Sequence, residues 1–285
     1  MSQNVPITIV GAVMLAMGLI VIGDAAGKLL AQDGVAAFFV AWSRFALAAI
    51  LLLPICGVQP GEWRTLKDWR VWLRALLIVC AISSILTALR TEPLANVFGG
   101  FFIGPIVSYF LSAWLLGERI SLARTGFLAV SFIGVLMVVK PGFGMTPGMG
   151  FAVLAGCFHG GYLVATRWLA NEHRPRFLLL SQLLIGAVVL LPPSLVAGWP
   201  SLDGFGLMMV LISALGSALG NYLLVVVNRS TPASLVAPLI YTKLIAATLV
   251  GYVVFADLPD WLSLTGLVII VTAGLSSLWL AKRGH

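Results

Sequence analysis

Charged side chains inside long apolar stretches are the residues of this sequence best suited to chemistry. Lys243 stands near the middle of the apolar run 233–255. A charge at the centre of a bilayer costs roughly 2.5–3.5 kcal/mol on insertion scales, so it needs a role in the protein interior. Lys243 is therefore predicted to bind a carboxylate or phosphate, or to act as a coupling group, with a structural salt bridge as the alternative.

Asp24, Lys28 and Arg44 are further charges inside apolar runs. Asp24 and Lys28 are four residues apart, so on a helix they share one face and are expected to neutralise each other in part. Lys28 lies near the end of its run, where a long side chain reaches the interface easily. Asp24 is the better candidate for a cavity or proton-linked group. For Arg44, helix-packing hydrogen bonds and contact with a substrate anion are equally favoured.

Neutral polar side chains in the apolar runs form a second set of candidates. Each is more often an interhelical hydrogen bond than a ligand contact, by roughly three to one. His159 gains weight because imidazole titrates near neutral pH, and Tyr241 because it is two residues from Lys243. Together with Lys243, Arg44 and Asp24, the residues predicted to bind substrate are Tyr241, Trp42, His159, Tyr222 and Asn221.

Four residues are predicted to act in gating or at the membrane interface. Glu118 and Asp257 stand at the ends of apolar runs, and Pro105 and Pro238 stand inside runs. A proline inside a helix removes a backbone hydrogen bond and gives a flexible point. Close approach of helices is predicted where two glycines are four residues apart, at Gly23/Gly27, Gly100/Gly104, Gly156/Gly160 and Gly216/Gly220.

The elements that carry these residues must lie in lipid. The 285 residues are 60% hydrophobic and 9% charged, with a mean hydropathy of +1.07, whereas soluble domains carry about 25% charged residues. The net charge of +7 does not indicate nucleic acid, because the basic residues fall singly between apolar runs. Runs long enough to span a bilayer are 7–30, 36–55, 71–89, 94–116, 122–139, 148–169, 177–197, 205–227, 233–255 and 262–281.

Basic residues in the short connections predict the orientation of the chain. Cytoplasmic loops hold an excess of Lys and Arg. Placing the N-terminus inside leaves only Lys28, Arg90 and Lys140 outside, so both termini are predicted to be cytoplasmic. The residues assigned to the inside are Arg64, Lys67, Arg70, Arg119, Arg124, Arg174, Arg176, Arg229, Lys282 and Arg283.

The sequence contains an internal repeat at an offset of 139 residues. Matches between apolar residues count for little in two hydrophobic segments, so the evidence lies in the proline, glycine and charged pairs. These include Gly11 with Gly150, Lys28 with Arg167, Pro54 with Pro193, Arg90 with Arg229, Pro93 with Pro232 and Glu118 with Asp257.

The repeat predicts the architecture. Residues 1–140 and 141–285 are each expected to hold five spans, and because five is odd the second copy enters the membrane from the opposite side. The predicted fold is an all-α membrane protein of ten transmembrane helices, arranged as two inverted five-helix repeats. Inverted repeats suit alternating access to a site near the midplane, with a duplicated scaffold as the alternative.

Three stretches resemble the drug/metabolite transporter superfamily, in particular its EamA-like ten-helix branch. They are 42–48 (WSRFALA), a stretch from Pro93 through Pro105 to the sequence LLGER at 115–119, and APLIY at 237–241 with Ala247, Gly251, Phe255, Asp257, Pro259, Gly266 and Gly274. The resemblance implies a solute carrier of the bacterial inner membrane. Members export amino acids and other metabolites, and some relatives import riboflavin or S-adenosylmethionine. Lys243 departs from the neutral polar residue expected there, which suggests an anionic substrate.

Other classes of protein fit less well. The segment 23–29 lacks the glycine spacing and the Ser or Thr of a Walker A motif, and Cys56, Cys80 and Cys157 show no metal-ligand spacing. No catalytic motif stands out, so no catalytic residue, metal or cofactor is predicted. An ion channel is expected to show a pore loop or rings of like charge.

The predicted function is secondary transport or facilitated movement of a small polar metabolite, an amino acid or a related anionic or zwitterionic solute, with efflux as the favoured direction. Import of a vitamin or nucleotide-type metabolite, of the riboflavin or S-adenosylmethionine class, is the alternative. A non-transporting scaffold or an intramembrane enzyme is the alternative from another class. The predicted partners are the substrate and the bilayer, and the sequence leaves the coupling ion and the oligomeric state open.

Overall fold

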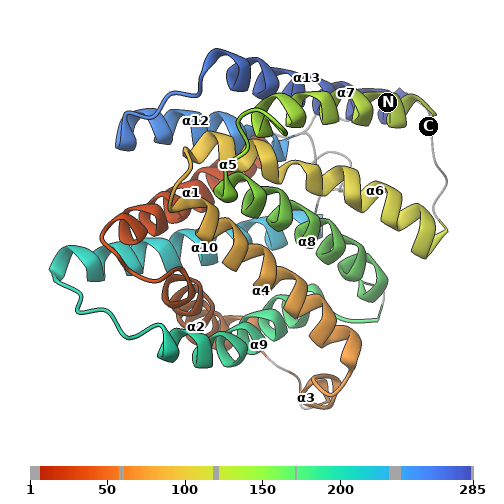
Figure 1. Ribbon diagram of the computed structural model, residues 1–285. Helices are drawn as coiled ribbons and strands as arrows, with labels where there is room; N and C mark the ends of the chain where they lie inside the picture. Colours follow the sequence, from red (N-terminus) through yellow and green to blue (C-terminus); the bar gives the residue numbers. More distant parts are fainter. Residues whose placement is uncertain are drawn as a thin grey trace.

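The computed structural model describes residues 7–57, 59, 61–117, 122–170, 172–230 and 239–283, and in these it contains helices and no strand (Figure 1). The helices are α1 (Ile7–Gln32), α2 (Ala37–Cys56), α3 (Glu62–Thr65), α4 (Trp69–Leu89), α5 (Leu94–Phe101), α6 (Ile103–Leu116), α7 (Leu122–Val139), α8 (Pro147–Leu169), α9 (Pro175–Val196), α10 (Gly204–Ser230), α12 (Thr242–Phe255) and α13 (Trp261–Arg283).

Seven helical segments of this described part are long and apolar enough to cross a membrane: α1, α2, α4, α5 with α6, α8, α9 and α10. Shorter apolar helices lie within α7, α12 and α13, at Thr125–Val139, Thr242–Phe255 and Trp261–Ser276. The predicted all-helical membrane fold is confirmed, and the count of ten spans stays a prediction.

A helix break and a helix end recur at the repeat offset of 139 residues. The chain turns at Phe102 between α5 and α6, and at Tyr241 before α12. The helices that follow have 14 residues each and end in left-handed residues, Gly117 with φ 67° and Ala256 with φ 53°. The Phe102 and Tyr241 rings pack with their centroids 5.0 Å apart, so the two breaks meet inside the bundle.

The helix pairs that pack most extensively join the first half of the chain to the second: α1 with α10, α2 with α9, α4 with α8, and α7 with α13. Glycines allow these approaches. A Cβ on Gly216 would lie 2.6 Å from the Leu19 carbonyl oxygen of α1, and one on Gly104 would lie 2.9 Å from the Gly156 carbonyl oxygen of α8. The predicted close approach is confirmed at these positions.

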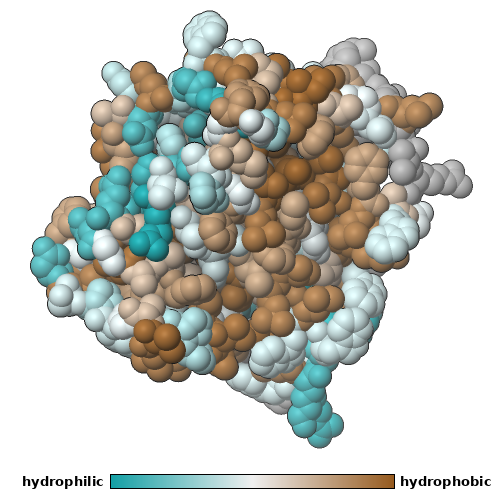
Figure 2. Space-filling model, viewed as in Figure 1, coloured by the Kyte–Doolittle hydropathy of each residue, from teal (hydrophilic) through white to brown (hydrophobic). Residues whose placement is uncertain are grey.

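We call the end where α1 begins and α13 ends the near end, and the opposite end, where α1 meets α2 and α12 meets α13, the far end (right and left in Figure 1). Large apolar side chains such as Trp114, Leu249 and Val253 are exposed on the outside of the bundle. Figure 2 shows hydrophobic side chains over its middle and hydrophilic ones gathered over the far end. An apolar belt between polar ends is the surface that a bilayer requires.

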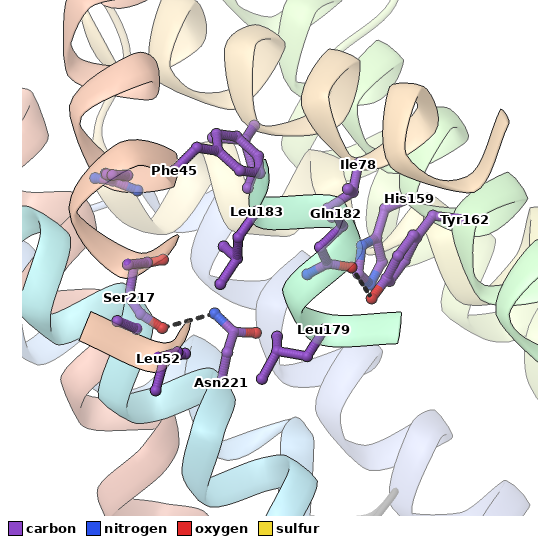
Figure 3. Close-up of a pocket in the computed structure, with 14 residues that line it drawn as sticks. Phe45, Leu52, Ile78, His159, Tyr162, Leu179, Gln182, Leu183, Ser217 and Asn221 are labelled. Carbon is purple, nitrogen blue, oxygen red and sulfur yellow. Dashed lines mark hydrogen bonds between the residues drawn. The ribbon is translucent and has the colours of Figure 1, made fainter. Parts of the chain in front are cut away.

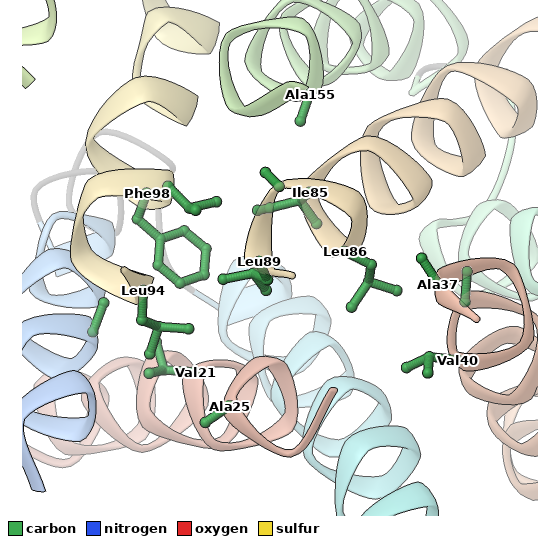
Figure 4. Close-up of a cluster of buried hydrophobic side chains, with 14 of the residues drawn as sticks. Val21, Ala25, Ala37, Val40, Ile85, Leu86, Leu89, Leu94, Phe98 and Ala155 are labelled. Atoms are coloured by element: carbon green, nitrogen blue, oxygen red, sulfur yellow. The ribbon is translucent and has the colours of Figure 1, made fainter. Parts of the chain in front are cut away.

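The buried core lies between α1, α2, α4, α5 and α8 (Figure 4). Val21, Val40, Leu86, Leu89 and Phe98 are at most 2% exposed and belong to one cluster. Leu86, Leu89 and Val40 lie toward the end of α4 and the start of α2 that meet the far end, so this part of the bundle is filled with apolar side chains.

A candidate solute-binding cavity

A cavity lies between α2, α4, α8, α9 and α10, on the near side of the core (Figure 3). The cavity has a volume of about 80 Å³, below the roughly 300–1,000 Å³ of typical small-molecule sites, so the helices must move apart for a solute to enter. Helices from both halves of the chain form the walls. The lining residues are Arg44, Phe45, Ala48, Leu52, Ile78, Ile82, His159, Tyr162, Leu179, Gln182, Leu183, Ser217, Ala218 and Asn221.

Neutral hydrogen-bonding groups supply most of the polarity of this wall. The Tyr162 hydroxyl donates to Gln182 Oε1 at 2.9 Å, and Asn221 Nδ2 donates to the Ser217 carbonyl oxygen at 2.7 Å. His159 lies against the Tyr162 ring, with centroids 5.7 Å apart. The remaining lining is largely aliphatic and aromatic, so the cavity suits an organic solute with an apolar body and a few polar groups.

A buried charge cluster adjoins the cavity. Arg44 Nη1 donates to Asp24 Oδ1 at 2.5 Å, and the other two contacts of the guanidinium are the Gly23 carbonyl oxygen at 2.6 Å and Ser213 Oγ at 2.7 Å. Lys243 Nζ lies 3.8 Å from Asp24 Oδ2 and 4.1 Å from the centre of the Phe98 ring. One carboxylate thus faces two basic side chains.

The far end is closed by packing and by an ion pair. Lys28, 4% exposed, donates to Asp257 Oδ2 at 2.9 Å and to the Glu92 carbonyl oxygen at 2.9 Å. The Glu92 carboxylate in turn accepts a hydrogen bond from Thr146, whose hydroxyl caps α8. These contacts tie α1, α4, α8 and α12 together on the side opposite the cavity.

Ion pairs also join the segments of the near end. Arg70 bridges Asp68 and Glu172 with contacts of 2.8 Å to each, and Arg174 binds Glu62 at 2.7 Å. The hydrogen bonds from Arg174 and Arg70 hold the pKa values of Glu62 and Asp68, respectively, below their usual range. These groups are solvent-accessible, so water can replace either partner when the near end moves.

Three of the eight predicted substrate-binding residues line the cavity: Arg44, His159 and Asn221. Asp24 and Lys243 lie beside it in the charge cluster. The other three are elsewhere: Trp42 packs with Trp199 and Phe39, Tyr241 packs against Phe102, and Tyr222 packs on the buried core.

The predicted pairing of Asp24 with Lys28 is wrong. Asp24 contacts Arg44 and Lys243, whereas Lys28 binds Asp257 and Glu92. The four-residue spacing puts the two side chains on one face of α1. Each of them instead contacts charged or carbonyl groups from other segments of the chain.

The predicted gating residues are only partly described. Asp257 forms the far-end ion pair. Pro105 lies in the first turn of α6, just after the break at Phe102. The Phe101 carbonyl oxygen, at this break, lies close to α8: a Cβ on Gly156 would be 2.5 Å from this oxygen. Glu118 and Pro238 lie outside the described residues.

Arg74 is a buried polar residue that the sequence predictions overlooked. Its guanidinium, 3% exposed, donates to Tyr162 Oη at 2.9 Å, Thr166 Oγ1 at 2.8 Å and the Leu178 carbonyl oxygen at 2.7 Å. Its position inside the apolar run 71–89 was the available signal. Tyr162 and Gln182 were visible as polar residues in runs, but nothing in the sequence placed them opposite each other.

A helical membrane bundle whose two halves interdigitate around a polar cavity has the architecture of a solute carrier. The model of the EamA-like transporter family matches residues 6–140 and 146–278. The chain therefore belongs to this family and is a multi-pass membrane transporter.

Similar proteins are named for different solutes. The chain is 27% identical over 252 residues to a Rickettsia felis S-adenosylmethionine uptake transporter, covering 86% of this chain and 84% of that one. A Rhizobium johnstonii riboflavin transporter is 25% identical, covering 82% and 78%. A Pseudomonas aeruginosa pseudopaline exporter is 29% identical, covering 70% and 69%. One solved crystal structure shares the fold, with a TM-score of 0.66 at 18% identity over 96% of this chain and 98% of that one.

Proposed function

We propose that the chain imports a vitamin- or nucleotide-type metabolite across the bacterial inner membrane by alternating access. The observation that carries the proposal is the cavity between helices of both halves, with the Lys28–Asp257 ion pair at the far end of the bundle. Similarity over most of the chain to proteins named for S-adenosylmethionine uptake and riboflavin transport supports this substrate class.

The proposed architecture is ten spans in two inverted halves, 1–140 and 141–285, with both termini in the cytoplasm. The recurrence of the helix break and the left-handed helix end at an offset of 139 supports two equivalent halves. In this arrangement the cavity faces the cytoplasm, and Lys28 with Asp257 closes the outer gate. Lys243, together with Arg44 if its pair with Asp24 loosens, would contact the carboxylate of a solute that carries one, such as S-adenosylmethionine, and His159 and Asn221 the neutral polar groups of the solute.

Counterflow into proteoliposomes tests the proposal. Vesicles that hold purified protein and unlabelled S-adenosylmethionine or riboflavin should accumulate the labelled compound with saturable kinetics, which a channel does not produce. Ala218→Leu places a larger side chain in the cavity wall and should lower exchange at least tenfold. Leu219→Phe, on the exposed face of the same helix, is the matched control and should exchange normally. Absence of exchange for both compounds, or exchange that Ala218→Leu leaves intact, would contradict the proposal.

Export of an amino-acid-type anion is the second candidate function. The two basic side chains, Arg44 and Lys243, that face the single carboxylate of Asp24 and the similarity to a pseudopaline exporter favour it. Counterflow with labelled glutamate and leucine in the same vesicles distinguishes the two. Exchange of amino acids, without exchange of S-adenosylmethionine or riboflavin, would replace the first candidate by the second.

A further inference from the structure

Two amide side chains in the cavity wall have their orientations fixed by the protein. The side-chain nitrogen of Asn221 donates to the Ser217 carbonyl oxygen, 2.7 Å away (Figure 3). A carbonyl oxygen can only accept a hydrogen bond, so the atom of Asn221 that contacts it must be the amide nitrogen. The amide oxygen of Asn221 is thereby left as an acceptor at the cavity.

Gln182 is fixed in the opposite sense by a relay of hydrogen bonds. Arg74 Nη2 donates to the Tyr162 hydroxyl at 2.9 Å, and a guanidinium cannot accept a hydrogen bond in return. The Tyr162 proton is therefore available for Gln182 Oε1, 2.9 Å away. This leaves the amide nitrogen of Gln182, a residue of the cavity wall, as a donor.

Arg74 holds this relay in place from behind the cavity wall. Its other nitrogens bind Thr166 Oγ1 and the Leu178 carbonyl oxygen, and its carbon Cζ lies 4.7 Å from the centre of the Tyr162 ring. Arg74 does not line the cavity. It is a positioning residue, because it acts on the cavity through Tyr162 and Gln182.

We propose that Gln182 and Asn221 recognise the hydrogen-bonding edge of a planar heteroaromatic ring that presents an acceptor beside a donor. Adenine has such an edge in N1 and its amino group, and a flavin has one in O4 and N3–H. Gln182 donates to the ring acceptor and Asn221 accepts from the ring donor. The inference rests on the proposed function, because it assigns the substrate class of the same cavity.

The rest of the wall fits this assignment. Phe45, Ile78, Tyr162 and Leu179 line the cavity with aromatic and aliphatic surface, which favours the faces of a flat ring. Because this edge of the ring is uncharged, its binding places no charge against the largely apolar lining of the cavity. Arg44, which does carry charge there, is already paired with Asp24.

Edge-altered analogues test the inference. Counterflow is measured for S-adenosylmethionine against S-inosylmethionine, in which the donor and acceptor positions are exchanged, and for riboflavin against 3-methylriboflavin, which lacks the N–H donor. A buried polar group left without its partner costs about 1–3 kcal/mol. We therefore expect the altered compound of each transported pair to compete at least tenfold more weakly.

Variants of both amides and of Arg74 locate the discrimination in the wall. Gln182→Met removes the donor that faces the ring acceptor and should lower the competition ratio of parent to analogue for the S-adenosylmethionine pair, in which that acceptor is altered. Asn221→Leu removes the acceptor that faces the ring donor and should bring the riboflavin ratio close to one. Arg74→Met should lower the S-adenosylmethionine ratio through the loss of orientation, and Arg74→Lys should restore part of it. Ser181→Ala is the matched control, because Ser181 donates to the Leu178 carbonyl oxygen and does not line this cavity. A purely structural role of Arg74 would lower the rates of parent and analogue alike and leave the ratio unchanged.

The outcomes separate this inference from the proposed function. Exchange of a parent compound with equal competition by its analogue would overturn the inference and leave the carrier intact. An unchanged S-adenosylmethionine ratio in Gln182→Met, or an unchanged riboflavin ratio in Asn221→Leu, would overturn it as well. Absence of exchange for both parent compounds would overturn the proposed function and the inference together.

Discussion

The charged side chains in the middle of the bundle are buried, whereas carboxylates at its far end are exposed to water. Asp24 and Arg44 are about 5% and 4% exposed, so each depends on the other for neutralisation. At the ends, the carboxylates of Asp257 and Asp260 are 37% and 48% exposed. Water can replace a partner at the ends but not in the middle.

This difference suggests separate duties for the two regions. A pair that must stay formed fixes α1 against α2 and α10, whereas pairs that water can replace can open and close during transport. The repeat relates Lys28 to Arg167 and Asp257 to Glu118, so a far-end gate would have its equivalent at the near end. Each of the following predictions changes a residue in one of the two regions.

Loss of Arg44 should have the largest effect on stability. Arg44→Met leaves the buried Asp24 carboxylate without its closest partner, and breaking a buried pair in this way costs about 3–5 kcal/mol. Chemical denaturation in detergent measures the loss. The triple variant Asp24→Asn, Arg44→Met and Lys243→Met removes every charge of the cluster and should recover much of it. Equal stability of Arg44→Met and the parent protein would show that the pair is dispensable.

Gly216→Ala tests how closely α10 packs on α1 in the middle of the bundle. The added methyl group would lie 2.6 Å from the Leu19 carbonyl oxygen, and backbone cannot move aside as a flexible side chain can. Overpacking of this kind costs about 1–3 kcal/mol. Gly18→Ala is the matched control on α1, because no atom lies within 4 Å of its added Cβ. Thermal unfolding should separate the two variants, and equal melting temperatures would contradict the close packing of α1 on α10.

Lys243→Met should separate stability from transport within the charge cluster. The closest partner of Asp24, Arg44, remains in this variant, so the free energy of unfolding should change by less than about 1.5 kcal/mol. Counterflow of the substrate should fall at least tenfold while membrane insertion stays normal. Unchanged counterflow would assign Lys243 to structure alone.

The sequence predicted more of the fold than of the site, for a physical reason. Hydrophobic run length and glycine spacing are properties that each segment carries by itself, and they yielded the helices and the positions of close approach, such as Gly216, but not which helices approach each other. The site depends on which helices become neighbours. That is why Lys28 was paired with Asp24 on its own helix instead of Asp257, more than two hundred residues away in sequence. Arg74 was missed for a related reason, since its partners come from α8 and α9.

The smallest effect is expected at the exposed ion pair of the far end. The hydrogen bond from Lys140, with further ones from Ser263, lowers the pKa of Asp260 from 3.8 to about 2, against the opposing effect of burial. Because the folded-state pKa is depressed, the stabilisation is present above pH 3.8 and is lost as the pH falls through about 2. Exposed pairs contribute less than about 1 kcal/mol, so Asp260→Asn should lower stability by no more than this at neutral pH. The difference between Asp260→Asn and the parent protein should shrink between pH 4 and pH 2 in denaturation experiments. A difference that grows on acidification would mean that this carboxyl group stabilises the far end in its protonated form.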